Sequence, residues 1–134
     1  TENESTNGGG IYCTGAFTVN NTGSIEVESN TATNGGGICM ENGTVILSSP
    51  SCEINSNIAS NNGGGLYVLN NSNTRKKSVF SGGNFSDNEA SAGGAICANG
   101  LIDLILGAVI KNDIPVIDNS RVILEENQAI NGKL

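Results

Sequence analysis

The chain is built on one repeated unit, and its fullest copy reads Phe85-Ser86-Asp87-Asn88-Glu89-Ala90-Ser91-Ala92-Gly93-Gly94-Ala95-Ile96. Degenerate copies run from Val27 to Ile38 and from Ile54 to Leu66, and partial copies open and close the chain. The Asn of each copy falls at 3, 30, 57, 88 and 127, so the steps are 27, 27, 31 and 39 residues. A period in this range is typical of a solenoid, in which each unit buries its apolar face by stacking on the next.

The pattern within the repeat favours strands over helices. Apolar residues alternate in short runs that Gly, Asn and Ser separate, without the three- and four-residue spacing of an amphipathic helix. Between Asn30 and Asn57 we expect strands at Ile38–Met40, Thr44–Leu47 and Cys52–Ile54, with turns at Asn42-Gly43, Ser48-Ser49-Pro50 and the Asn-x-Ala-x-x-Gly-Gly segment. The side chains expected to point inward are Ala32, Ile38, Met40, Val45, Leu47, Cys52 and Ile54 in this rung, and Ile11, Cys13, Phe17, Val19 and Ile25 in the first.

Three short strands and three turns form one rung of a parallel β-helix. We therefore predict an all-β, parallel β-helix of about four to five rungs that makes a single domain over residues 1–134. The general preference for right-handed crossovers predicts a right-handed helix.

The repeated letters of the unit have physical roles in such a helix. An Asn in each rung would stack about 4.8 Å from the next, where side-chain amides hydrogen-bond along the column, and Asn also tolerates the left-handed backbone of a sharp corner. This structural stack comprises Asn3, Asn30, Asn57, Asn88 and Asn127. Glycine pairs would supply positive φ and close backbone approach at Gly9, Gly10, Gly36, Gly37, Gly64, Gly65, Gly93 and Gly94. Two aliphatic columns are expected, of Ile11, Ile38, Leu66 and Ile96 and of Val27, Ile54, Phe85 and Leu124.

The Phe-x-x-Asn and Gly-Gly-Ala-Ile motifs, intact at Phe85–Asn88 and Gly93–Ile96, resemble the repeat of the chlamydial polymorphic membrane proteins. Similar repeats occur in secreted right-handed β-helix proteins of bacteria and some protists. The other copies place Val, Ile or Leu for Phe and Gly for Ala. The resemblance implies a surface-exposed or secreted module, commonly an autotransporter passenger domain that serves adhesion and virulence.

Composition excludes some partners. The net charge is −7, with six Lys plus Arg and no His, so the chain lacks the basic footprint that nucleic acid or an anionic membrane surface requires. No apolar run approaches the length of a transmembrane helix. Because the chain starts within a repeat, we expect it to be part of a longer extracellular protein, anchored through a segment outside this chain.

Two segments depart from the regular rung and are the predicted binding regions. The loop Asn70–Lys77 carries Arg75, Lys76 and Lys77, which would suit an acidic glycan, although a solvated loop is the simpler interpretation. The apolar excursion Leu101–Asn119 lengthens the fourth rung. It could form an interface through Leu104, Ile110 and Ile114, or be an extra strand that patches the fold.

Catalytic and metal chemistry is weakly indicated. Glu26 and Glu53 occupy the same position of neighbouring rungs, about 5 Å apart on an outer face beside Glu28, which could suit Ca²⁺ or a retaining glycosidase. A solvated acidic patch is the simpler interpretation, and we expect no catalytic residue, metal site or cofactor. The spacing of Cys13, Cys39, Cys52 and Cys97 matches no zinc motif. Cys39 and Cys97 share an outward column with Tyr12 and Tyr67 but lie two rungs apart, beyond disulfide reach, whereas secretion would favour bonding.

The sequence thus predicts a non-enzymatic adhesin or stalk module that binds a host-surface protein or a glycan through its loops. The alternative is a structural subunit that stacks end to end with other copies in a fibre or coat. A polysaccharide-active enzyme depends on the Glu26 and Glu53 pair alone.

Overall fold

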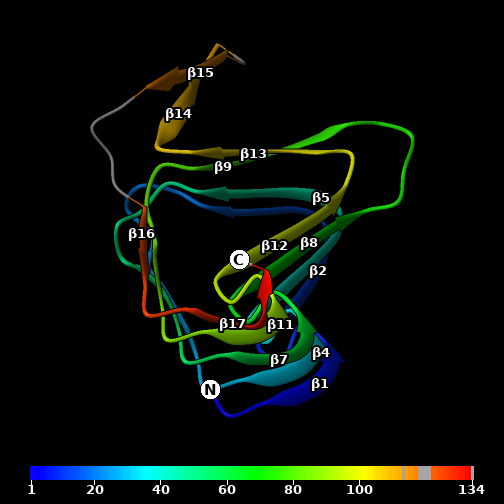
Figure 1. Ribbon diagram of the computed structural model, residues 1–134. Helices are drawn as coiled ribbons and strands as arrows, with labels where there is room; N and C mark the ends of the chain where they lie inside the picture. The colour runs from blue at the N-terminus through cyan, green and yellow to red at the C-terminus, as the bar shows by residue number, and fades with distance from the viewer. Residues whose placement is uncertain (113, 118–121, 134) are drawn as a thin grey trace.

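The chain winds through about four turns of a parallel β-helix in the computed structural model, which describes residues 1–112, 114–117 and 122–133. The side chains of residues 108–111, 114–117 and 130–133 lie outside that description. The predicted fold class is confirmed: the described chain is all-β, and strands of successive turns pair in parallel (Figure 1).

Three parallel sheets form the walls of the helix. Sheet A has five strands, β1 (Glu4–Asn7), β4 (Thr31–Asn34), β7 (Ile58–Asn62), β11 (Glu89–Ala92) and β17 (Gln128–Lys133). Sheet B has six strands, β2 (Ile11–Val19), β5 (Ile38–Leu47), β8 (Leu66–Asn70), β9 (Lys76–Phe80), β12 (Ile96–Gly100) and β13 (Ile102–Leu106). Sheet C has four strands, β3 (Ile25–Glu28), β6 (Cys52–Asn55), β10 (Asn84–Ser86) and β16 (Ile123–Glu125).

A fourth, two-stranded sheet lies outside the stack. Its strands β14 (Ala108–Lys111) and β15 (Ile114–Ile117) pair antiparallel and project from the helix beyond β13 (Figure 1).

The register of the sheets builds the core that the alternation predicts. Ile11, Ile38, Leu66 and Ile96 pair in one column, and Val27, Ile54, Phe85 and Leu124 pair in another. All seven residues predicted to point inward in the second rung are buried. The inward residues of the first rung also belong to the core or pack against it, so these predictions are confirmed.

The strand boundaries differ from those predicted in three places. The turn expected at Asn42-Gly43 is a bend inside the continuous strand β5, where Asn42 has a φ of 55°. The Asn-x-Ala segment contains a strand of sheet A in every turn, because its Gly run alone makes the corner. Leu101–Leu106 is not part of the excursion: β13 pairs with β9 over five residues, so the departure from the rung starts after Leu106.

Left-handed backbone occurs one residue before each stacked Asn, and not at the Asn as predicted. These preceding residues have φ between 51° and 56°, and they are Glu2, Ser29, Ser56, Asp87 and Glu126. The Asn that follows does not have a positive φ, and at positions 30, 57 and 88 its side chain is buried inside the helix. The strained left-handed backbone of the corner therefore falls on the residue before the Asn, whose type differs between copies, and the Asn side chain is free to hydrogen-bond.

The glycines divide their roles differently from the prediction. Positive φ belongs to the first Gly of each run, at Gly8, Gly35, Gly63 and Gly93, so Gly93 alone of the predicted set has it. At the other seven predicted positions, an added Cβ would lie 2.3–2.9 Å from a backbone oxygen of the next layer. Those glycines are therefore required because the layers approach each other so closely.

Candidate functional site

A buried ladder of amides runs the length of the helix. Asn57 Nδ2 donates to Asn88 Oδ1 at 3.0 Å, and the same oxygen accepts from the Asn57 backbone N–H at 3.0 Å. Equivalent pairs of bonds join Asn3 to Asn30, Asn30 to Asn57 and Asn88 to Asn127. The five asparagines therefore hold the layers in register and serve structure, because those at 30, 57 and 88 are inaccessible to a ligand.

A second amide ladder escaped the sequence analysis. Asn34 Nδ2 donates to Asn7 Oδ1 at 3.2 Å, and Asn62 Nδ2 donates to Asn34 Oδ1 at 2.9 Å. The sequence does indicate this ladder, since an Asn directly precedes the Gly run in each of these three copies.

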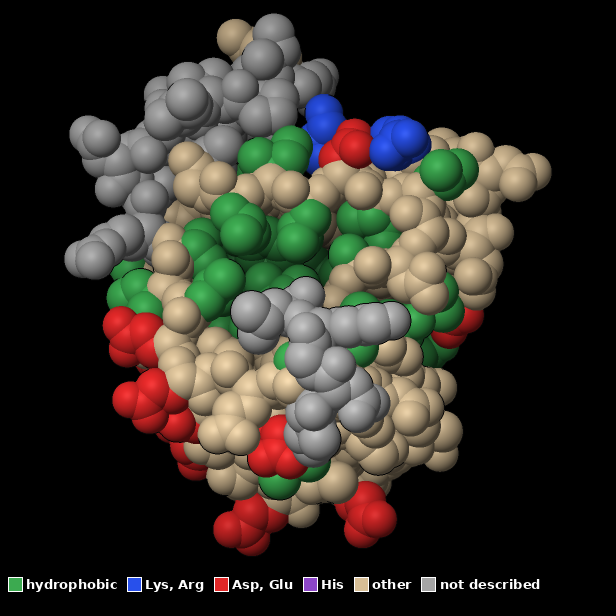
Figure 2. Space-filling view, in the orientation of Figure 1, with side chains coloured by type: hydrophobic (Ala, Val, Ile, Leu, Met, Phe, Trp, Pro, Cys, Tyr) green, Lys and Arg blue, Asp and Glu red, His purple; other side chains and the backbone are tan. Residues whose placement is uncertain are grey.

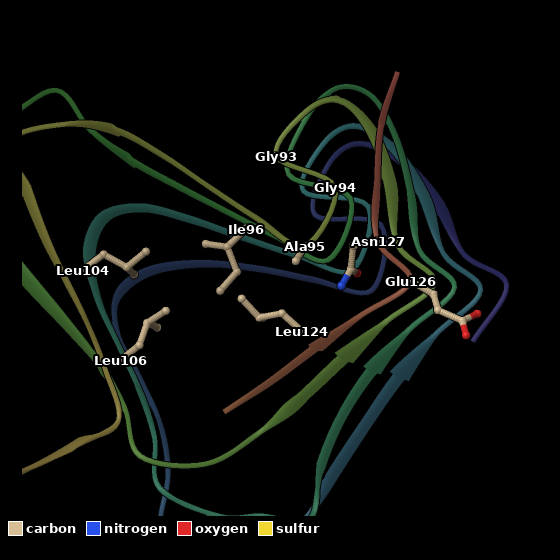
Figure 3. Close-up of a pocket in the computed structure, with 9 residues that line it drawn as sticks. All are labelled: Gly93, Gly94, Ala95, Ile96, Leu104, Leu106, Leu124, Glu126 and Asn127. Carbon is tan, nitrogen blue, oxygen red and sulfur yellow. The ribbon is translucent and has the colours of Figure 1, made fainter. Parts of the chain in front are cut away.

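An apolar cavity lies beside strand β13. A cavity of about 400 Å³ is lined, among the described residues, by Gly93, Gly94, Ala95, Ile96, Leu104, Leu106, Leu124, Glu126 and Asn127. The side chains of Ile96, Leu104, Leu106 and Leu124 converge on it, whereas Glu126 points away (Figure 3). In the face shown in Figure 2, hydrophobic side chains gather around a central hollow and acidic side chains lie toward the margins. The cavity is thus an apolar opening into the core, and its lining suits aliphatic groups and not a sugar or an ion.

Among the predicted binding residues whose side chains the structure describes, Leu104 is the one that lines this cavity. Ile110 and Ile114 lie in β14 and β15, and their side chains are outside the described residues. Leu106, which lies in the predicted excursion, and Leu124, which belongs to a predicted core column, were not singled out as binding residues, and they complete the apolar lining.

The basic residues are less available than a loop finger would require. Strand β9 starts at Lys76, so Lys76 and Lys77 lie in sheet B and not in the predicted loop. Arg75 does lie in the connection, but its Nη1 is 2.9 Å from Asp103 Oδ1. This ion pair neutralises one of the three charges offered to an acidic glycan.

The acidic pair is in the predicted register. Glu26 pairs with Glu53 across β3 and β6 on the outer face of sheet C. Glu53 Oε2 accepts from Asn84 Nδ2 at 3.0 Å and from Asn55 Nδ2 at 3.3 Å, so neighbouring amides occupy it. No group of three or more His, Cys, Asp or Glu in the described part of the chain could hold a metal ion.

All four cysteines are free thiols. Cys39 and Tyr67, expected to face outward, are buried, because the glycine corner folds over their column. Burial raises the pKa of Cys39 to about 11, with a smaller contribution from the charge of Glu41. A thiol held neutral in this way is a packing group and a poor nucleophile.

The described residues contain no helix long and apolar enough to cross a membrane. The predicted kinship with the polymorphic membrane proteins stays a prediction. Comparisons with protein-family models, with curated proteins and with solved structures give no match for this chain.

Proposed function

We propose that this chain is a rigid β-helix module of a cell-surface or secreted protein, acting as an adhesin or stalk that binds a host protein or a glycan. The observation that supports it is the hairpin β14–β15, which leaves an otherwise regular stack and projects from it (Figure 1). Connections carried on a rigid scaffold are where binding residues concentrate.

The hairpin is inserted without disturbing the layer that carries it. Strand β13, just before it, pairs with β9 over five residues, and β16, after it, pairs with β10 over three. The insertion accounts for the 39-residue step between Asn88 and Asn127. A segment that lies outside the three parallel sheets is free to carry recognition.

Binding to an array of glycans and host-surface proteins tests this proposal. The intact chain is compared with a variant lacking residues 108–117 and with an Arg75→Ala, Lys77→Ala control that keeps the hairpin. We expect the deletion to abolish binding and the control to retain it, with far-UV circular dichroism confirming that both are folded. Failure of the folded intact chain to bind any array member would contradict the proposal, and loss in the control alone would assign recognition to the basic residues.

End-to-end assembly is the second candidate, and the open sheet edges favour it. Sedimentation velocity separates the two candidates, because assembly predicts particles that lengthen with concentration.

The expectations of no enzymatic activity, no cofactor, no nucleic-acid partner and an extracellular location belong to the same proposal.

A further inference from the structure

Five copies of the acceptor signal for N-linked glycans occur in the chain. The signal, Asn-x-Ser/Thr with x other than Pro, starts at Asn3, Asn20, Asn42, Asn70 and Asn84. Their number alone says nothing, because Asn, Ser and Thr are abundant in this sequence. The surroundings of the five Asn side chains differ, and they decide which of them can carry a glycan.

The chemistry of the transfer sets three requirements. A side-chain amide is a weak nucleophile, because its nitrogen lone pair is delocalised into the carbonyl group. The hydroxyl of the Ser or Thr two residues on must therefore contact that same amide, and the Asn Nδ2 must be free and reachable from solvent. The folded chain must also leave room for a bulky sugar on that nitrogen.

The signal at Asn20-Asn21-Thr22 meets all three requirements. It forms an exposed turn between β2 and β3, which the Gly23 N–H closes by donating to the Asn20 carbonyl at 3.0 Å. The Thr22 hydroxyl donates to Asn20 Oδ1 at 3.0 Å, and the Thr22 backbone N–H donates to the same oxygen at 3.2 Å. Among the described residues, none accepts a hydrogen bond from Asn20 Nδ2. The hydroxyl thus holds the amide oxygen, and the amide nitrogen is left free.

The signal that starts at Asn70 has the same local turn but a buried amide. The Ser72 backbone N–H and hydroxyl donate to Asn70 Oδ1 at 3.1 and 2.6 Å. Asn70 is only 3% exposed, however, and its Nδ2 donates to the carbonyls of Thr74 and Leu101 at 2.9 and 2.7 Å. Both amide hydrogens are therefore in use, and a sugar on this nitrogen would break one of these bonds.

In the other three signals, the hydroxyl or the amide is committed to a different partner. Ser5 Oγ donates to the Asn7 carbonyl at 3.0 Å, and so turns away from its own Asn. Ser86 Oγ donates to Asn55 Oδ1 at 2.9 Å. The amide oxygen of Asn42, which lies inside strand β5, accepts a backbone N–H of the loop after β8 at 2.8 Å. None of these three has the hydrogen-bonded turn that Thr22 makes.

We infer that Asn20 is an N-glycosylation site, to which the glycan is transferred from a lipid-linked oligosaccharide. The bond from Asn20 Nδ2 to the anomeric carbon of the first sugar forms as the bond from that carbon to the lipid pyrophosphate breaks. The amide loses one proton, the lipid pyrophosphate leaves, and no oxidant or reductant is needed. The inference rests on the proposed secreted or cell-surface location, since N-linked glycans are carried by surface loops of secreted proteins.

A glycan at Asn20 would stand on the corner that carries the hairpin. Val19, directly before Asn20, belongs to the core column that reaches Leu106 three layers on. The hairpin β14–β15 starts two residues after Leu106, so the two sites are about 14 Å apart along the helix axis. The glycan and the hairpin would therefore lie along the same edge of the helix.

Secretion of the 134-residue chain from a eukaryotic host, behind a signal peptide, tests the inference. Peptide mapping by mass spectrometry, before and after treatment with peptide-N-glycosidase, reports which Asn carries sugar, because the enzyme converts a glycosylated Asn to Asp. We expect the folded, secreted chain to carry a glycan at Asn20 and none at Asn70. The natural protein, mapped in the same way, should also carry a glycan at Asn20.

A matched pair of variants separates the role of the turn from the role of burial. Thr22→Ala and Ser72→Ala each remove a hydroxyl that contacts the Asn of its own signal. Thr22→Ala should abolish the glycan at Asn20, and Ser72→Ala should leave it unchanged. Thr22→Ser, which keeps the hydroxyl, should keep the glycan. Far-UV circular dichroism after deglycosylation shows whether each variant is folded.

Three outcomes would overturn the inference. They are an unmodified Asn20 in the folded secreted chain or in the natural protein, a glycan at Asn70 in the folded chain, and equal loss of the glycan in Thr22→Ala and Ser72→Ala. Array binding by a chain that carries no glycan would contradict this inference and leave the proposed function intact. A glycan at Asn20 on a chain that binds no array member would do the reverse.

Discussion

Replacing Asn57 with Ala tests the ladder at its centre. Asn57 is fully buried, and its Oδ1 accepts from the Asn30 backbone N–H at 3.1 Å and from Asn30 Nδ2 at 3.0 Å. Its Nδ2 donates to Asn88 Oδ1 at 3.0 Å and to the Val27 carbonyl at 2.8 Å. The substitution therefore removes four hydrogen bonds at once and keeps the backbone unchanged.

The expected cost follows from the donors that remain. Both Asn30 donors lose their acceptor inside the core. Because Asn30 is itself only 1% exposed, water cannot easily take the place of the lost acceptor oxygen. A buried polar group left unsatisfied costs about 1–3 kcal/mol, so two cost about 2–6 kcal/mol. Because domains are stable by only about 5–15 kcal/mol, Asn57→Ala should remove a large fraction of the free energy of unfolding.

Asn34→Ala is the matched control, in the preceding layer of the helix. Asn34 also makes two ladder bonds, to Asn7 and Asn62, but it is only half-buried, so water can satisfy the partners it leaves. We expect a loss of about 1 kcal/mol or less. Urea unfolding followed by far-UV circular dichroism measures both variants, and a loss for Asn57→Ala no larger than that for Asn34→Ala would refute the reasoning.

Three further predictions concern packing, pH and surface charge. Gly64→Ala should destabilise the helix more than Gly15→Ala in the same urea assay, since the new Cβ lies 2.5 Å from the Gly94 oxygen in one case and meets nothing within 4 Å in the other. Gly15→Ala should itself cost about 1–2 kcal/mol because its φ is +98°. Stability should fall as pH rises from 9.0 toward about 11, because the unfolded Cys39 thiol ionises before the folded one, and Cys39→Ala should reduce that fall in thermal melts at successive pH values. Arg75→Ala should change the free energy of unfolding by less than about 1 kcal/mol, since its pair with Asp103 is exposed; a larger change would assign that pair a structural role.

Much of the fold could be predicted because the solenoid repeats its requirements. Each layer needs a buried amide at one corner and aliphatic side chains at alternate strand positions, so residues like Asn57 and Ile38 recur at the matching position of each copy. The left-handed position before each Asn could not be found this way. Glu, Ser and Asp all occupy it, because the corner constrains its backbone and leaves its side chain in solvent.

The strand β13 was misassigned for a related reason. Five of the six residues in Leu101–Leu106 are apolar, so alternation, the signal of a half-buried strand, is weak there. The strand lies in the last layer, where its outer side meets a cavity, and Leu106 remains exposed. The extra apolar residues therefore belong to a strand that lines a cavity, and they do not mark a departure from the stack.

The cavity itself could have been predicted by counting. The chain contains five of the stacked asparagines but only four Gly-Gly runs followed by an apolar residue, at Ile11, Ile38, Leu66 and Ile96. Within residues 1–134, one sheet therefore has a strand more than its neighbour. What the count cannot give is the size of the resulting hollow or the orientation of the leucines, which depend on packing.

Amide hydrogen exchange, resolved by residue with NMR, tests the stacked layers and their open edge together. The account predicts that the backbone amides of Asn30, Asn57 and Asn88 are among the slowest to exchange, since each donates to a ladder oxygen of the next layer. It predicts fast exchange at Leu104 and Leu106, whose amides face the unpaired edge of β13. Slow exchange at those leucines in the isolated chain, or fast exchange at Asn57, would contradict it.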